Sequence, residues 1–133
     1  MRACLLATAL SLPIAGGAQQ CSTALPGGRQ LESARFSLGY RTFPGAPAVG
    51  KHFALEIAVC PKAGTPAPEG VRVDAHMPEH RHGMNYKAQV AAAQDGRYKA
   101  EGLMFHMPGR WELFFDVRAG GRTDRLAQSV VLE

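Results

Sequence analysis

The sequence has little cysteine, few aromatic residues and no long run of charge. Its 133 residues include three cysteines, one tryptophan, three tyrosines and six phenylalanines. The 15 lysines and arginines form no run of five, so despite the formal net charge of +4 the basic stretch typical of nucleic-acid binding is missing. No apolar run after residue 18 reaches the roughly 20 residues of a membrane span. These absences exclude nucleic acid as a partner and a membrane span in the mature chain, and the overall composition is that of one globular domain.

The first eighteen residues have the composition of a secretory signal peptide. Arg2 gives the segment a positive start, residues 3–15 are apolar, and residues 16–18 are small enough for cleavage. We therefore expect residues 1–18 to be removed and the mature protein to be soluble and exported, for example to the periplasm. A lipid anchor at Cys21 is the alternative, which the two glutamines before that cysteine disfavour.

Cleavage at this position would remove Cys4 and leave Cys21 and Cys60. An even number of cysteines in an exported protein indicates a disulfide. In the chain-entropy model, closing so long a loop stabilises the fold by roughly 3 to 4 kcal/mol. The alternative is that the two thiols bind a soft metal ion.

The remaining chain has the two-residue period of β-strands. Apolar and polar side chains alternate in residues 51–60, 71–77 and 110–118, and weaker strands are predicted at 35–43, 85–92, 97–105 and 123–132. Glycine and proline mark the turns between them, and no window has helical periodicity. We expect an irregular lead-in over residues 19–34 and one domain over 35–133. Seven short strands predict an all-β fold, an immunoglobulin-like antiparallel β-sandwich.

The strand order also predicts which loops lie together. Because consecutive strands of such a sandwich reverse direction, loops 44–50, 78–84 and 106–109 share one end, called here the upper pole. Cys60 falls at the opposite end, the lower pole. Cys21 precedes the first of the seven strands and can reach the lower pole as well, so the topology permits the disulfide.

Histidines and methionines gather at the upper pole. All five histidines lie on or beside its loops, as do four of the five methionines. Thioethers prefer Cu(I), and imidazoles bind both Cu(I) and Cu(II), so this donor set suits copper. Zinc is the main competitor, although its structural sites use four Cys or His donors and gain nothing from methionine. The candidate metal ligands are His76, His80, His82, Met84, His106 and Met107.

Several of these residues also have a structural interpretation. Met77 continues the inward-facing set of its strand, so we expect it in the core. Met107 also continues an inward-facing set, and for this residue both core packing and metal ligation remain open. His76 and His106 lie on the outward phase, where solvated histidines are common. His52 starts a strand and is expected to be a neighbour of the site only. The loop that carries His80, His82 and Met84 is not expected to contribute side chains to the core. These three residues either bind a metal ion or belong to a mobile, solvated loop.

Three stretches together resemble the YtkA-like/FixH-like family of small exported or membrane-attached bacterial domains. They are residues 76–84, the Gly-Arg-Tyr of 96–98, and the Met-Pro-Gly-Arg-Trp-Glu-Leu of 107–113 with Phe-Asp-Val at 115–117. The resemblance covers roughly residues 36–132. It implies an immunoglobulin-like sandwich, a role in copper handling or oxidase assembly, and a copper-accepting or oxidase-assembly protein as partner. The family's Met- and His-bearing loop falls on Met77, His80, His82 and Met84, and its Met-Pro-Gly turn on residues 107–109. Unlike FixH-type proteins, the mature chain is expected to have no membrane anchor.

We therefore expect a monomeric, exported copper-binding protein that acts as a carrier, buffer or metallochaperone. An enzyme is not expected, because no Ser-His-Asp or Cys-His arrangement can be placed and Asp74 and Glu79 form no carboxylate pair. The alternative function is an assembly module of the cell envelope whose His/Met loops dock a partner protein, since methionine-rich loops make adaptable contact surfaces. Copper uptake distinguishes the two.

Overall fold

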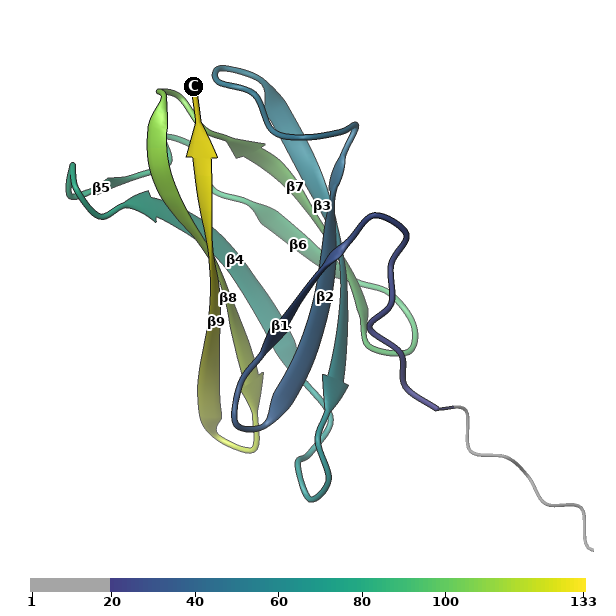
Figure 1. Ribbon diagram of the computed structural model, residues 1–133. Coiled ribbons are helices and arrows are strands. Elements are labelled where there is room, and N and C mark those ends of the chain that lie inside the picture. The colour runs from purple at the N-terminus through teal and green to yellow at the C-terminus, as the bar shows by residue number, and fades with distance from the viewer. Residues whose placement is uncertain (1–19) are drawn as a thin grey trace, which may run out of the picture.

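The computed structural model describes residues 20–133, and within them the only regular elements are strands (Figure 1). The expected signal peptide, residues 1–18, lies outside the described residues. No helix able to cross a membrane occurs in the described part of the chain. The strands are β1 (Arg29–Glu32), β2 (Phe36–Phe43), β3 (His52–Pro61), β4 (Gly70–Met77), β5 (His82–Gly83), β6 (Gln89–Ala92), β7 (Arg97–Met104), β8 (Gly109–Ala119) and β9 (Arg122–Leu132).

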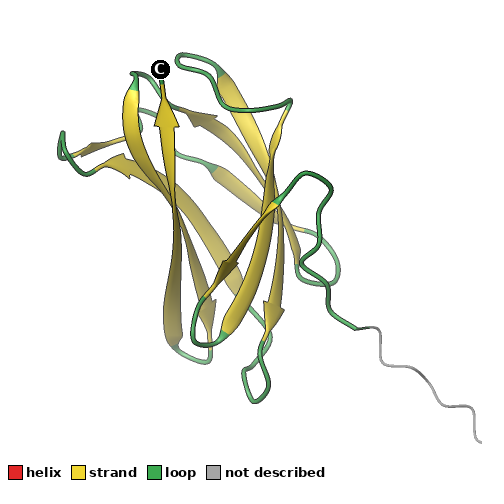
Figure 2. Ribbon diagram, in the orientation of Figure 1, coloured by secondary structure: helices red, strands yellow, loops and turns green. Residues whose placement is uncertain are grey.

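The strands form two antiparallel sheets that pack face to face (Figure 2). One sheet has the order β1-β2-β3-β7-β6 and the other the order β5-β4-β8-β9. Without the short strands β1 and β5, this is the ABED and CFG arrangement of an immunoglobulin constant domain. The predicted immunoglobulin-like sandwich is confirmed.

The seven predicted strands correspond to β2, β3, β4, β6, β7, β8 and β9, and two short strands were not predicted. The prediction of an irregular lead-in over 19–34 is wrong for β1, whose four residues contain one apolar side chain, Leu31, and so show no period. β1 exists because it pairs with β2, from Arg29 opposite Tyr40 to Glu32 opposite Ser37. β5 is a two-residue pairing with the end of β4.

The core follows the two-residue period of the sequence. The inward-facing side chains of β3, β4 and β8 are buried, with relative exposures between 0% and 9%. Met77 is fully buried, which confirms the expectation that it belongs to the core. The inward-facing set consists of Phe53, Leu55, Ile57 and Val59 of β3, Val71, Val73, Ala75 and Met77 of β4, and Trp111, Leu113, Phe115 and Val117 of β8.

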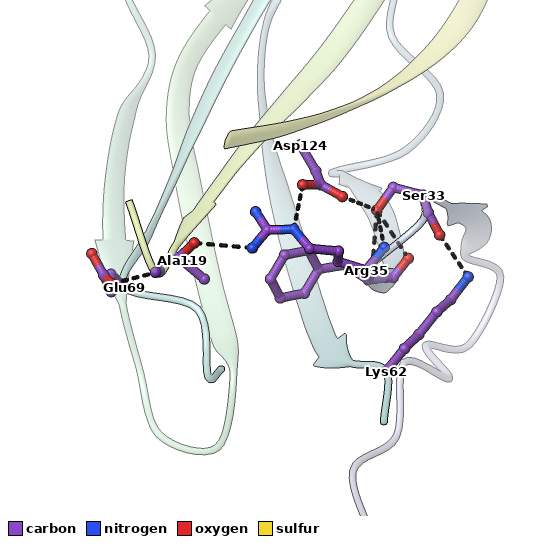
Figure 3. Close-up of polar contacts among 8 residues, drawn as sticks. Ser33, Arg35, Lys62, Glu69, Ala119 and Asp124 are labelled. Atoms are coloured by element: carbon purple, nitrogen blue, oxygen red, sulfur yellow. Dashed lines mark hydrogen bonds and ion pairs between the residues drawn. The ribbon is translucent and has the colours of Figure 1, made fainter. Parts of the chain in front are cut away.

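The lower pole is closed by covalent and ionic links. Cys21 and Cys60 form a disulfide, which confirms the predicted pairing. Arg35 reaches across from the β2 sheet to the β9 sheet: its Nε donates to Asp124 Oδ1 at 2.7 Å and its Nη1 to the Ala119 carbonyl at 3.0 Å (Figure 3). Burial alone would raise the pKa of Asp124, but the hydrogen bonds from Ser33 and Arg35 outweigh it, and the pKa is lowered. Arg35 thus fastens the two sheets together at the end that lacks the histidines, and the disulfide ties the segment before β1 to the end of β3 in the same sheet.

Candidate functional site

The three predicted loops do meet at the upper pole. The connections β2–β3, β4–β6 and β7–β8 lie at the end of the sandwich where the chain also ends (Figure 1). The β2–β3 and β7–β8 connections are hydrogen-bonded to each other, because the Gly50 amide donates to the Phe105 carbonyl at 2.8 Å. The reversal of successive strands therefore places the loops as the sequence predicted.

His82 and His106 come from different loops and lie side by side. In the β4–β5 pairing His82 stands opposite Met77, and residues directly opposite in an antiparallel pair share one face of the sheet. Because Met77 points into the core, His82 is turned toward the inner side at the rim. His106 follows the end of β7, and the two imidazole ring centres are 5.2 Å apart. The expectation that the 78–84 and 106–109 loops bring their side chains together is confirmed.

Trp111 forms the floor beneath these two histidines. Its ring is fully buried and meets both imidazoles edge-on, with centre distances of 5.9 Å to His82 and 5.2 Å to His106. Its Nε1 donates to the Met107 carbonyl at 3.0 Å, which holds the β7–β8 connection in place. Sequence reasoning did not assign Trp111 to the site, although its inward phase next to the Met-Pro-Gly turn was a usable signal.

The ring nitrogens of the pair have different environments. His82 Nδ1 lies 3.1 Å from the Gly83 carbonyl, so it carries the proton and leaves the Nε2 lone pair available. His106 Nδ1 is buried and has no hydrogen-bond partner among residues 20–133. A buried polar atom without a partner costs about 1 to 3 kcal/mol. A ligand that engages this nitrogen would remove that cost.

His80 extends the pair into a row of three rings, called here the histidine trio. Its ring centre is 5.8 Å from that of His82, and its side chain is exposed, whereas His82 and His106 are half-buried. Within residues 20–133, no three His, Cys, Asp or Glu side chains converge as a metal-binding group. The trio is therefore arranged in series, and a zinc site with four such donors is not built here.

Three methionines of the upper pole belong to the hydrophobic core or pack against it. Met84 and Met107 are half-buried and pack against the hydrophobic core, each one or two residues from a member of the trio. Met77 lies deeper, and its Cε occupies the space directly beside Gly109. Packing is thus established for Met84 and Met107, and their thioethers are the soft donors nearest in sequence to His82 and His106.

Two histidines of the upper pole lie away from the trio. His76 points to the outer face of its sheet, because neighbouring strand residues alternate and Met77 points inward. There its Nε2 is 3.8 Å from Glu112 Oε1. The structure therefore does not place the candidate ligand His76 with His82, because the ring of His76 lies on the outer face beside Glu112. His52 is exposed and contacts Tyr86 at a ring-centre distance of 4.9 Å, so it lies outside the trio, as expected.

The sequence matches the YtkA-like family over residues 42–115, more than half of the chain. The chain belongs to the YtkA-like family. The matched region contains the trio and Trp111, so the family resemblance of the sequence is confirmed. Among solved structures, the chain is similar to a DUF4426 family protein from Pseudomonas aeruginosa PAO1, with a TM-score of 0.51 and 13% identity over 83% of this chain and 99% of that one. At this identity the likeness concerns the fold alone. No curated protein matches the sequence significantly.

Proposed function

We propose that this YtkA-like protein binds copper at the upper pole and acts as an exported carrier, buffer or metallochaperone. The observation that carries the proposal is the pair His82 and His106, brought together from two loops with one available nitrogen on His82 and one buried, unsatisfied nitrogen on His106. With metal–nitrogen bonds of about 2.0 Å, two imidazoles on one ion have ring centres up to about 6 Å apart. The observed 5.2 Å is compatible with a shared ion.

The surroundings of the pair favour copper over zinc. Trp111, which meets both imidazoles, packs against Phe105 with ring centres 5.0 Å apart, and the thioethers of Met84 and Met107 are the soft donors nearest to the pair in sequence. Soft thioether donors select Cu(I), whereas zinc would require further nitrogen, thiolate or carboxylate donors, and no such group converges among residues 20–133. Cys21 and Cys60, the two cysteines of the described residues, supply no thiolate because they are joined in the disulfide.

The disulfide bears on where the protein acts, and the carrier role bears on which partner it needs. A disulfide is typical of an oxidising, non-cytoplasmic compartment, which supports export to the periplasm or its equivalent. A carrier needs an acceptor, and we propose a copper-accepting or oxidase-assembly protein in that role. The protein itself would act as a monomer and without catalysis.

The test is native mass spectrometry of the exported protein with Cu(I), Cu(II) and Zn(II) offered in competition. Wild type and the control His52→Ala should each retain copper stoichiometrically, and the double variant His82→Ala/His106→Ala should lose it. His52 is the matched control because it is a histidine of the same pole that does not touch the trio. Uptake that survives in the double variant would place the copper site elsewhere. A wild-type protein that takes up no copper would favour the partner-docking module instead.

A further inference from the structure

We infer that His80 is a transient ligand through which copper enters and leaves the His82–His106 pair, an inference that rests on the proposed function. The three rings form a row with successive centre distances of 5.8 Å and 5.2 Å. Both distances lie within the limit of about 6 Å for two imidazoles on one ion. Because no three such donors converge in residues 20–133, the row offers two neighbouring two-imidazole positions and no single three-imidazole position.

Solvent exposure decreases along the row from His80 to His106. His80 is exposed, His82 and His106 are half-buried, and the last nitrogen of the row, His106 Nδ1, is fully buried. His80 sits at the tip of the tight turn between β4 and β5, where the amides of His80 and Arg81 both donate to the Met77 carbonyl, at 3.2 Å and 2.9 Å. The backbone of the turn is therefore fixed, while the His80 side chain extends into solvent. An acceptor or donor protein reaches His80 first.

The exchange step keeps one metal–ligand bond throughout. His82 has a single available nitrogen, Nε2, because its Nδ1 donates to the Gly83 carbonyl. Copper held by His80 and His82 remains on His82 Nε2 while the bond to His80 breaks and a bond to His106 forms. No electron or proton is transferred, and the oxidation state of copper stays the same. A tethered imidazole acts at a high effective concentration, so this exchange avoids releasing the ion into water.

This role predicts an effect on rates without an effect on equilibrium. His80 does not belong to the final position of the ion, so its removal leaves the Kd unchanged. Because the Kd is the ratio of the two rate constants, uptake and release must then slow by the same factor. A ligand of the final position, such as His106, has a different signature: its removal weakens the Kd and speeds release.

Stopped-flow fluorescence can separate these signatures. Trp111 is the only tryptophan of the chain and lies edge-on to both His82 and His106, so copper at that pair should quench its emission. Uptake is measured by mixing with Cu(I), and release by mixing the loaded protein with a bathocuproine chelator. In His80→Ala, both rate constants should fall several-fold together with an unchanged Kd, and His52→Ala should behave as wild type. Thermal unfolding of each variant verifies the fold.

The outcomes distinguish the relay from the copper site itself. Unchanged rates in His80→Ala would overturn the relay while leaving the His82–His106 site in place. A Kd weakened in His80→Ala as much as in His106→Ala would also overturn it, because His80 would then be an ordinary ligand. Wild-type protein that shows no saturable quenching and no copper uptake would instead refute the proposed function, on which the relay depends.

Discussion

Gly109, the first residue of β8, is the position where a single added methyl group should disturb the upper pole most. Its φ of +121° is a conformation that L side chains rarely adopt, and a Cβ built there would stand 2.7 Å from Met77 Cε. Strained backbone of this kind costs about 1 to 3 kcal/mol. Met77 is flexible at its end but fully buried, so moving it aside adds a repacking cost of about 1 kcal/mol. Gly109→Ala should therefore lower the free energy of unfolding by roughly 2 to 4 kcal/mol.

Two other glycines of the same pole separate these contributions. Gly50 has a φ of +74° with no atom within 4 Å of its hypothetical Cβ, so Gly50→Ala carries the backbone strain alone, about 1 to 2 kcal/mol. Gly45 has open space and no positive φ, so Gly45→Ala should stay within about 0.5 kcal/mol of wild type. Urea unfolding of the oxidised protein, followed by Trp111 fluorescence, measures all three variants in one assay.

The order of the three losses in unfolding free energy tests whether backbone strain and repacking of Met77 both contribute. Equal losses in Gly109→Ala and Gly50→Ala would show that Met77 adapts at no cost and would remove the packing part of the argument. A loss in Gly109→Ala as small as that in Gly45→Ala would refute both parts. A double-mutant cycle with Met77→Leu, which changes the branching beside Gly109 at nearly constant volume, then measures the coupling between the two positions.

Three further outcomes are expected. Replacing both Cys21 and Cys60 by serine should lower the free energy of unfolding by about 4 kcal/mol in urea titrations, given a sequence separation of 39, and a loss below about 1 kcal/mol would contradict the chain-entropy estimate. Hydrogen bonds from Arg125 lower the pKa of Asp116, so the stability that this carboxylate contributes is present above its unfolded pKa of about 3.9 and is lost as pH falls through the lower folded pKa. Asp116→Asn should therefore cost about 1 kcal/mol near neutral pH and nothing in strong acid, and a cost equal at both pH values would refute the charge argument. Finally, Cu(II) affinity measured by competition should fall from about pH 7 to about pH 5, because an imidazole binds metal only without its proton. A flat profile would show that imidazoles are not ligands of the ion.

The fold could be predicted from the sequence because burial alternates so regularly. In β3, β4 and β8 one face of each strand is apolar, and a shift by one residue would expose every core side chain, which fixes the phase of each strand. β1 and β5 could not be found in this way. Each is too short to show a period, and each exists only because a longer strand, β2 or β4, offers it backbone partners.

The candidate site was predictable in part, for a similar reason. Strand reversal alone brings the loop of His82 to the loop of His106. The outward phase did not distinguish His76 from His106, because both were assigned that phase and only His106 lies beside His82. The direction of His82 was not predictable, because the four-residue turn at 78–81 interrupts the two-residue period. Only the pairing of His82 with Met77 decides that its ring faces the inner side. The place of Trp111 beside the histidines was not predicted, because packing alone explains a buried aromatic residue on the core-facing side of a strand.

The two poles of the sandwich differ in how firmly they are held, and this difference suits a metal carrier. At the lower pole the Arg35–Asp124 ion pair joins the two sheets, the disulfide ties the segment before β1 to the end of β3, and the Gly120 amide in the β8–β9 turn donates to Glu69 just before β4. At the upper pole Trp111 and Gly109 anchor the base of the β7–β8 connection, while His80 extends into solvent above it. The links that close the lower pole thus lie at the opposite end of the sandwich from the histidine trio. For the proposed copper carrier, such a division would allow the trio to gain and lose an ion without unfolding the domain, since none of its three side chains belongs to the buried core.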